Sequence, residues 1–140
     1  MKERYWEHFY HQADIGVRGV GASTGEAFQQ AALAMMAVIC NPENVAATEQ
    51  VDIERSCDDI ELLLADWLNA LIYEMATRNM LFSEFQVRLE DGKLTGKAWG
   101  EKADCERHET AVEVKGATYT ELKVELGDDD LWMAQCVVDV

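Results

Sequence analysis

Two aspartates near opposite ends of the chain are the residues best placed to do chemistry. Asp14 lies in the segment 11–16 (HQADIG), between small and apolar residues at the mouth of an expected strand. Asp139 follows the largely apolar run 131–138 and precedes Val140, which carries the chain-terminal carboxylate. A charge in such a place is costly unless it is solvated, paired or bound to a cation. If the last strand ends beside Asp14, three carboxylates converge there.

Three converging carboxylates repel one another unless a cation lies between them. Their oxygen donors suit calcium, magnesium or manganese, with water filling the remaining positions. The alternative is that Asp14 and Asp139 are ordinary solvated ends of strands. The acidic run 128–130 (DDD) lacks the spaced ligands and distal glutamate of an EF-hand, so we interpret it as a solvated turn.

Other polar residues form weaker patterns. His11 lies beside an aromatic pair and has no metal-ligand partner four residues away, which favours a structural or hydrogen-bonding role. Cys105 and His108 come nearest to a zinc pattern, but no further ligand completes the set. Glu101 follows a predicted strand. Lys115 alternates with acidic neighbours and could form an ion pair or reach a phosphate or acidic group on a partner.

Net charge restricts the class of partner. The 140 residues contain 12 Lys and Arg against 27 Asp and Glu, a formal charge of −15. Nucleic acid binding depends on basic side chains, so this surface would repel RNA, DNA and anionic membranes and attract a basic partner. Solubility, or an organism whose proteins are generally acidic, is the competing explanation of the charge. No nucleophile elbow and no phosphate-binding loop occurs, so the sequence does not predict an enzyme.

The remaining composition indicates one ordinary domain. The length fits a single domain over 1–140, and the apolar content of 49% supports a core. The start of the chain is charged and no run approaches the length of a spanning helix, so we expect a cytoplasmic protein without a membrane segment. Four scattered cysteines without a C-x-x-C pair are expected to be reduced and inert.

Two helices and a set of strands are predicted to position these residues. The segment 23–26 (STGE) has the form of a capping box and opens a helix that stops at 41–42 (NP). A second helix begins near Asp58 and frays near 78–79. Their order with the strands favours an α+β fold, a mixed β-sheet with two helices packed on one face. Strands are expected at 15–17, 51–53, 84–90, 93–99, 112–114, 122–126 and 131–138.

Taken together, these segments resemble the archease family. The segment 11–16 is similar to its H-T-A-D-[IV]-G motif, and 23–35 is similar to its first helix. The second helix, the W-G-E motif at 99–101, the segment 113–119 (EVKGATY) and the ending 138–140 (VDV) also match in the family's order. The resemblance therefore extends over the whole chain.

This resemblance implies a fold of strand-helix-strand-strand modules and a function. Archeases are accessory factors of the RtcB-type RNA-splicing ligase, which joins tRNA halves through a guanylylated histidine. They promote that guanylylation and allow multiple turnover, so the ligase is the expected partner and no direct binding of nucleic acid is expected. The family metal site carries over to Asp14, Asp139 and Val140, with calcium as the expected ion. His11, Glu101, His108 and Lys115 are secondary candidates for the surface that contacts the partner.

Two positions depart from the family pattern. Gln12 stands where the family usually has Thr, and Gly116 where it usually has Ala. Neither change removes a proposed ligand. Gly116 is expected to loosen the strand beside Lys115 by about 0.5–1 kcal/mol relative to Ala.

Two other classes of function remain open from the sequence. A metal-dependent phosphoester hydrolase could use the same carboxylates, although no general base or substrate pocket is evident. A general protein chaperone is the other alternative. How the cation would act in the activator is also open, since it could order an acidic tip that enters the ligase active site or deliver a metal to it.

Overall fold

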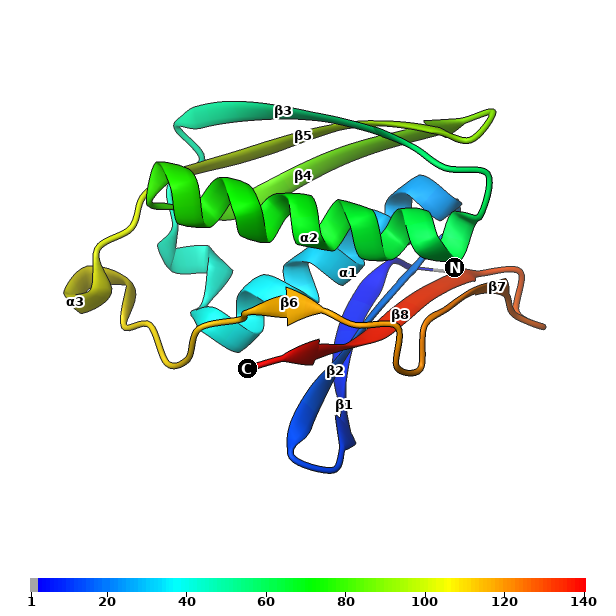
Figure 1. The fold of residues 1–140 in the computed structure, drawn as a ribbon, viewed down its shortest axis with the longest axis horizontal. Coiled ribbons are helices and arrows are strands. Elements are labelled where there is room, and N and C mark those ends of the chain that lie inside the picture. The colour runs from blue at the N-terminus through cyan, green and yellow to red at the C-terminus, as the bar shows by residue number, and fades with distance from the viewer. Residues whose placement is uncertain (1–2) are drawn as a thin grey trace.

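The computed structural model describes residues 3–140, in which the chain forms eight strands, two long helices and two short helical turns (Figure 1). In chain order the elements are β1 (Tyr5–His11), β2 (Asp14–Gly21), α1 (Thr24–Ile39), η1 (Pro42–Asn44), β3 (Glu49–Ser56), α2 (Ile60–Arg78), β4 (Met80–Glu90), β5 (Lys93–Lys102), α3 (Cys105–His108), β6 (Gly116–Ala117), β7 (Lys123–Leu126) and β8 (Trp132–Asp139).

The strands divide between two sheets. The larger has the order β1-β2-β8-β6, with β7 also paired to β8, and the smaller has the order β3-β5-β4. Each pairing between described strands is antiparallel. The α+β class is confirmed, and β3-α2-β4-β5 is a strand-helix-strand-strand module. The expected single mixed sheet with both helices on one face is instead two antiparallel sheets, and α1 contacts both of them. Tight turns join β1 to β2 and β4 to β5, and such turns reverse the chain, which accounts for the antiparallel pairing of these two hairpins.

Helix α1 lies between the two sheets and touches both of them. It packs against β2 and β8 of the larger sheet and against β4 of the smaller one. Its start confirms the predicted capping box: the Glu26 amide donates to the Ser23 hydroxyl at 3.1 Å, and the Ala22 amide donates to the Glu26 carboxylate at 2.9 Å. A helix enclosed on two sides needs small residues, which explains its five alanines within 24–39.

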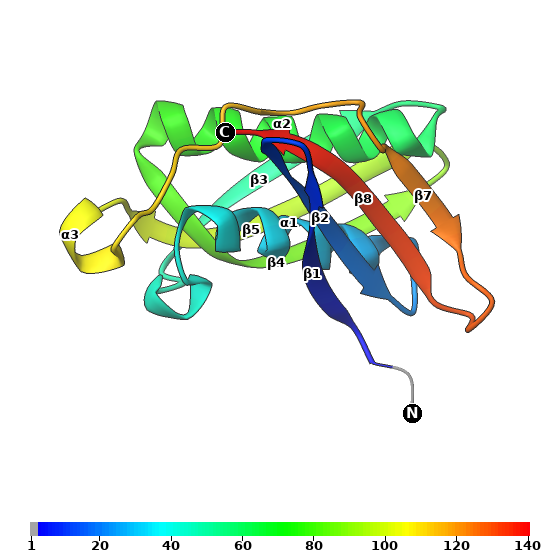
Figure 2. The ribbon, with the colours of Figure 1, turned by 90° about the horizontal axis from the view of Figure 1, so that it is seen from below.

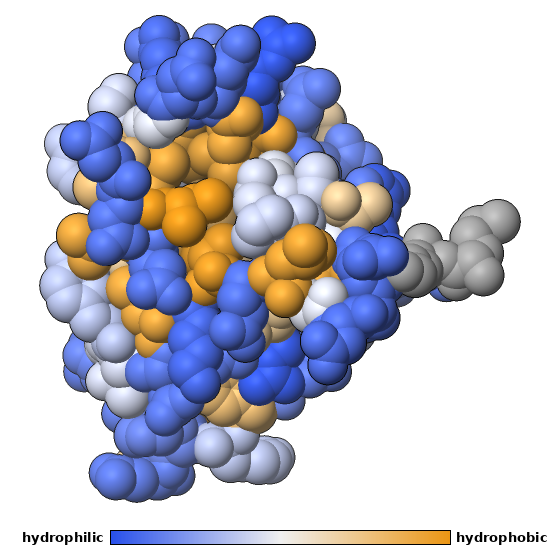
Figure 3. Space-filling model, turned by 90° about the vertical axis from the view of Figure 1, so that its right-hand side faces the viewer, coloured by the Kyte–Doolittle hydropathy of each residue, from blue (hydrophilic) through white to orange (hydrophobic). Residues whose placement is uncertain are grey.

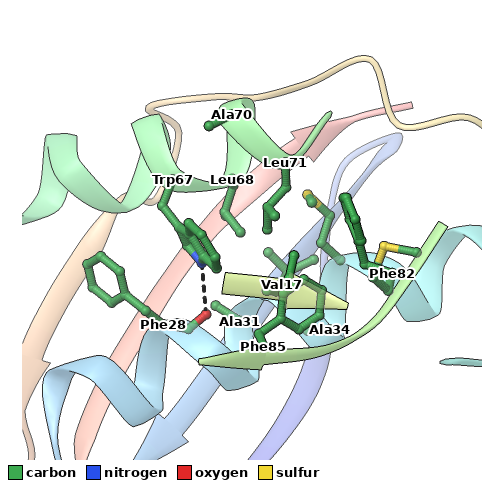
Figure 4. Close-up of a cluster of buried hydrophobic side chains, with 14 of the residues drawn as sticks. Val17, Phe28, Ala31, Ala34, Trp67, Leu68, Ala70, Leu71, Phe82 and Phe85 are labelled. Atoms are coloured by element: carbon green, nitrogen blue, oxygen red, sulfur yellow. Dashed lines mark hydrogen bonds between the residues drawn. The ribbon is translucent and has the colours of Figure 1, made fainter. Parts of the chain in front are cut away.

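The core is centred on the facing surfaces of α1 and α2 (Figure 4). Trp67 of α2 is fully buried, and its indole N–H donates to the Phe28 carbonyl of α1 at 3.2 Å. The Trp67 and Phe85 rings meet edge to face at 6.1 Å. A buried indole needs a partner for its N–H, and the helix carbonyl supplies it. The predicted apolar stripe on the second helix is therefore core.

A polar cluster, the Glu101 clasp, ties the end of β5 to two loops. The Glu101 carboxylate accepts from the Ala46 amide at 2.8 Å, from Arg107 at 2.8 Å and from Nε2 of His108 at 2.9 Å. The Asp104 amide donates to Nδ1 of His108 at 2.9 Å, so the ring proton lies on Nε2. These bonds, led by the one from His108, lower the pKa of Glu101 to about 2.

The segment between β5 and β7 differs most from expectation. The predicted strand at 112–114 is wrong, because 109–115 has no regular structure and the strand in this region is β6. Val114 is buried while Val112 is exposed, and the Ala111 amide donates to the Ile39 carbonyl at the end of α1. This segment therefore pairs with a helix end instead of a strand. The edge strand β1 and the short helix α3 were not predicted. None of the helices within 3–140 is long and apolar enough to cross a membrane.

The contact between α1 and β2 generates the first prediction. A Cβ added to Gly19 would lie 2.1 Å from the Ala31 amide nitrogen and 2.2 Å from the Ala27 carbonyl oxygen. We expect Gly19→Ala to lower the free energy of unfolding by about 1–3 kcal/mol, measured by urea denaturation. Gly116→Ala is the control, since a Cβ there meets only the Asn69 side chain at 3.5 Å. It should be neutral or stabilise by up to about 1 kcal/mol. Equal losses in both variants would contradict this account.

The Glu101 clasp generates a prediction about pH. Glu101 has a lower pKa when folded, about 2 against an ordinary 4.5, so its ionised form stabilises the fold. That contribution is complete above pH 4.5 and is lost as the pH falls toward 2. Glu101→Gln should therefore be less stable than the wild type at pH 7, and the difference should shrink over this range. Urea midpoints at a series of pH values measure it, with the exposed Glu125→Gln as control. A difference that stays constant down to pH 2 would refute the prediction.

Candidate functional site

The two predicted aspartates lie at the same end of paired strands. The β2–β8 ladder runs from Gly21 opposite Trp132 to Ile15 opposite Val138, so Asp14 and Asp139 each follow its last pair by one residue. The ladder therefore brings the ends of the two strands together. Convergence of the two carboxylates on a cation stays a prediction.

Each aspartate also has a partner on a neighbouring strand. His11 of β1 is opposite Asp14, and Gly116 of β6 is opposite Asp139. The turn between β1 and β2 contains Gln12 with φ 55, a left-handed conformation that closes the hairpin. Figure 1 shows this hairpin pointing downward, below the C-terminus, and Figure 2 shows the same hairpin from below. The ends of β2 and β8 are thus each paired with a neighbouring strand, β2 with β1 and β8 with β6.

The aspartates face away from α1. Side chains alternate along a strand, and Val17 and Gly19 of β2 lie on the α1 side, so Asp14 and Arg18 lie on the other. Arg18 confirms this side because its Nε donates to Gln135 of β8 at 2.8 Å. Asp14 is half-buried and Asp139 is exposed. The carboxylates are therefore accessible from outside the protein while their strands belong to the core.

Val140 is the third ligand that the family resemblance implies, and its role stays a prediction. Its side chain is partly buried against the core, which restrains the position of the last residue. Within residues 3–140, no group of three or more His, Cys, Asp or Glu side chains could hold a metal ion. Asp14 and Asp139 thus need the Val140 carboxylate, backbone oxygens or water as further donors. An all-oxygen set of this kind fits calcium or magnesium and not zinc.

The secondary candidates lie in different places. Glu101 and His108 belong to the clasp, where the His108 side chain is fully buried and uses both ring nitrogens. A direct contact of His108 with a partner would need the clasp to open, and Arg107 and Glu101 are the members nearer the surface. Lys115 is exposed and its backbone joins the end of β8. His11 is opposite Asp14. Contact of these residues with a partner stays a prediction.

The cysteines take no part in the site. Cys40 and Cys136 are buried, and burial raises the pKa of both thiols, that of Cys136 to about 12. Cys57 is half-buried, Cys105 is exposed, and all four are free. Raised pKa values keep the buried thiols protonated and unreactive, as the sequence predicted for inert cysteines.

Two hollows have neither aspartate in their lining. One, of about 220 Å³, has Ile60, Leu63 and Leu89 among its lining residues. It lies at the end of the molecule where Figure 3 shows apolar side chains ringed by hydrophilic ones. The other, of about 610 Å³, runs between the end of α2 and the segment 110–115. Each has only one basic side chain in its lining, Lys93 or Lys115, and acidic side chains beside it, so neither offers the positive charge that a phosphate ester would need.

One residue important to the site was not found from the sequence. Asn69 of α2 makes two hydrogen bonds to Ala117 of β6, the strand next to Asp139. A single amide in the otherwise apolar stretch 67–71 (WLNAL) was the available signal. Only the tertiary structure shows what that amide faces.

Comparison with known proteins agrees with the fold and the motifs. The family model of the archease protein family matches residues 6–140. The archease of Pyrococcus furiosus is 45% identical over 98% of this chain and 99% of its own length. That of Thermococcus kodakarensis is 40% identical over 98% and 99%.

Solved structures agree as well. The solution structure of protein 1598 from Methanobacterium thermoautotrophicum is 36% identical, with a TM-score of 0.84 over 96% of this chain and 98% of that one. The crystal structure of an archease from Thermotoga maritima, described as a possible chaperone, shares the fold at 21% identity, with a TM-score of 0.64 over 96% of each chain. On the family match and the close relatives, the chain belongs to the archease protein family.

Proposed function

We propose that this protein activates an RtcB-type RNA ligase, promoting its guanylylation and multiple turnover, through a divalent cation held at the end of β8. The observation that carries the proposal is the placement of Asp14 and Asp139, 125 positions apart in the chain, at the same end of the paired strands β2 and β8. Family membership supports the choice of partner. The protein would act on the ligase without turning over a substrate of its own.

The cation would be bound by the side chains of Asp14 and Asp139 and by the carboxylate of Val140. Calcium fits best because it accepts six to eight oxygen donors in flexible geometry, including water. A bound cation would supply positive charge that offsets the carboxylates and orders the adjoining turn. The chain's own contribution is to hold the two aspartates on paired strands, so that little entropy is lost on binding.

The charge of the protein supports a protein partner over a direct RNA contact. With a formal charge of −15, its surface repels the RNA phosphates and attracts the basic groove that an RNA ligase must carry. Such attraction speeds encounter and depends on ionic strength.

Asp139→Ala tests the proposal. This variant should lower the rate of ligase guanylylation by about 10-fold or more, because a ligand contributes at least as much as the outer groups around a metal. The measurement is single-turnover guanylylation and multiple-turnover RNA ligation with purified ligase and calcium. Asp128→Ala, in the exposed acidic turn, removes the same charge and is the matched control. Thermal unfolding of both variants checks that the fold is intact.

The outcomes separate the alternatives. Full activation by Asp139→Ala would reject the role of the cation site. Absence of activation by the wild-type protein would reject the function. Hydrolysis of phosphoesters by the protein alone would favour the metal-dependent hydrolase instead, and broad suppression of aggregation of unrelated proteins would favour the chaperone.

A further inference from the structure

The short strand β6 needs support from outside its sheet. It consists of Gly116 and Ala117 only, and one of its edges pairs with β8. Two residues cannot hold a strand in place by themselves, since ordering each one costs about 1–2 kcal/mol of backbone entropy. The other edge of β6 faces α2, a helix whose backbone groups are already paired within the helix.

The Asn69 side chain takes the place of a neighbouring strand. The Ala117 amide donates to Oδ1 of Asn69 at 2.9 Å, and Nδ2 of Asn69 donates to the Ala117 carbonyl at 3.1 Å. The backbone N–H and C=O of Ala117 are thus both paired with one side-chain amide, which carries a donor and an acceptor as a peptide unit does. Of side chains of this length, only that of Asn can do so. Asp accepts but does not donate when ionised.

The segment 115–118, which Asn69 binds through Ala117, in turn holds the end of β8. The Lys115 amide donates to the Asp139 carbonyl at 2.7 Å. The Thr118 amide and hydroxyl donate to the Val137 carbonyl at 3.0 and 2.7 Å. On its other edge β8 pairs with β2, next to Asp14. The backbone of Asp139 is therefore fixed from the side of β6, and that side is fixed by Asn69.

We propose that Asn69 is a positioning residue for the cation site, holding 115–118 against β8 and so setting the place of Asp139 relative to Asp14. The two Asn69–Ala117 hydrogen bonds, which we call the clamp, are observed. The effect of the clamp on a cation rests on the proposed function. Asn69 makes no contact with either aspartate. It acts through Ala117 and the register of β6, as an outer group that orients a ligand.

The test uses Asn69→Ala and Asn69→Asp, with Val124→Ala as the matched control. Val124 is a buried residue of β7, which pairs with the other half of β8 at Ala134. The Ala variant loses both bonds to Ala117, and the Asp variant keeps the size and loses the donor. Two measurements are made on the full chain: hydrogen exchange of individual amides, and calcium affinity by titration calorimetry.

We expect both Asn69 variants to speed exchange at the Lys115 and Thr118 amides, which Asn69 does not touch, and to weaken calcium binding by about 10–100-fold. Val124→Ala should change neither, although it also lowers the thermal midpoint. Unchanged exchange at Lys115 and Thr118 would overturn the clamp, and calcium affinity equal to that of the control would overturn its role at the site. If the wild-type protein bound no calcium, magnesium or manganese while the exchange result held, the proposed cation site would fail and the clamp would stand.

Discussion

The structure depends on the pairing of β8 along both of its edges. β2 occupies one edge, and β7 and β6 share the other, so the backbone of the last strand is held over its whole length. Its residues 134–138 are buried, with Val138 fully enclosed, and Asp139 is the first exposed residue after them. A strand paired along both edges is held in one register, because a shift of one residue would exchange the side chains that face α1 with those on the other face. The same register brings the end of β8, where Asp139 lies, to the end of β2, where Asp14 lies.

Small residues allow α1 to pack closely against the larger sheet. Helix α1 approaches β2 so closely at Gly19 that backbone atoms of Ala27 and Ala31 occupy the space of a side chain. The helix can then lie between the two sheets, with Trp67 of α2 closing the core above it. Polar contacts are placed at the periphery, where the Glu101 clasp and the Asn69 amide each tie an irregular segment to a regular element. The apolar centre supplies stability, and these polar contacts decide where the loops lie.

The net negative charge of the protein and the position of Asp14 and Asp139 on strands affect how the protein would meet a partner. The overall charge of −15 disfavours compaction and favours encounter with a basic partner. Asp14 and Asp139 lie at the ends of paired strands, so in the proposed function a cation between them would not have to order a flexible loop. The comparisons show the archease family, and the proposed activation of a ligase goes beyond them.

The sequence by itself determined the local elements and the chemical type of the site. The capping box at 23–26, the stop at 41–42 and the apolar stripe around Trp67 predicted both helices, because caps and periodicity act through neighbours in the chain. The short strand at 116–117, the division into two sheets, the clasp of His108 with Glu101 and the contact of Asn69 with Ala117 were decided by the tertiary structure. Each joins residues through pairing or burial that no local pattern encodes. For Asp14 and Asp139, the residue types indicated an oxygen-lined site, whereas only the pairing of β2 with β8 brought the ends of their two strands together.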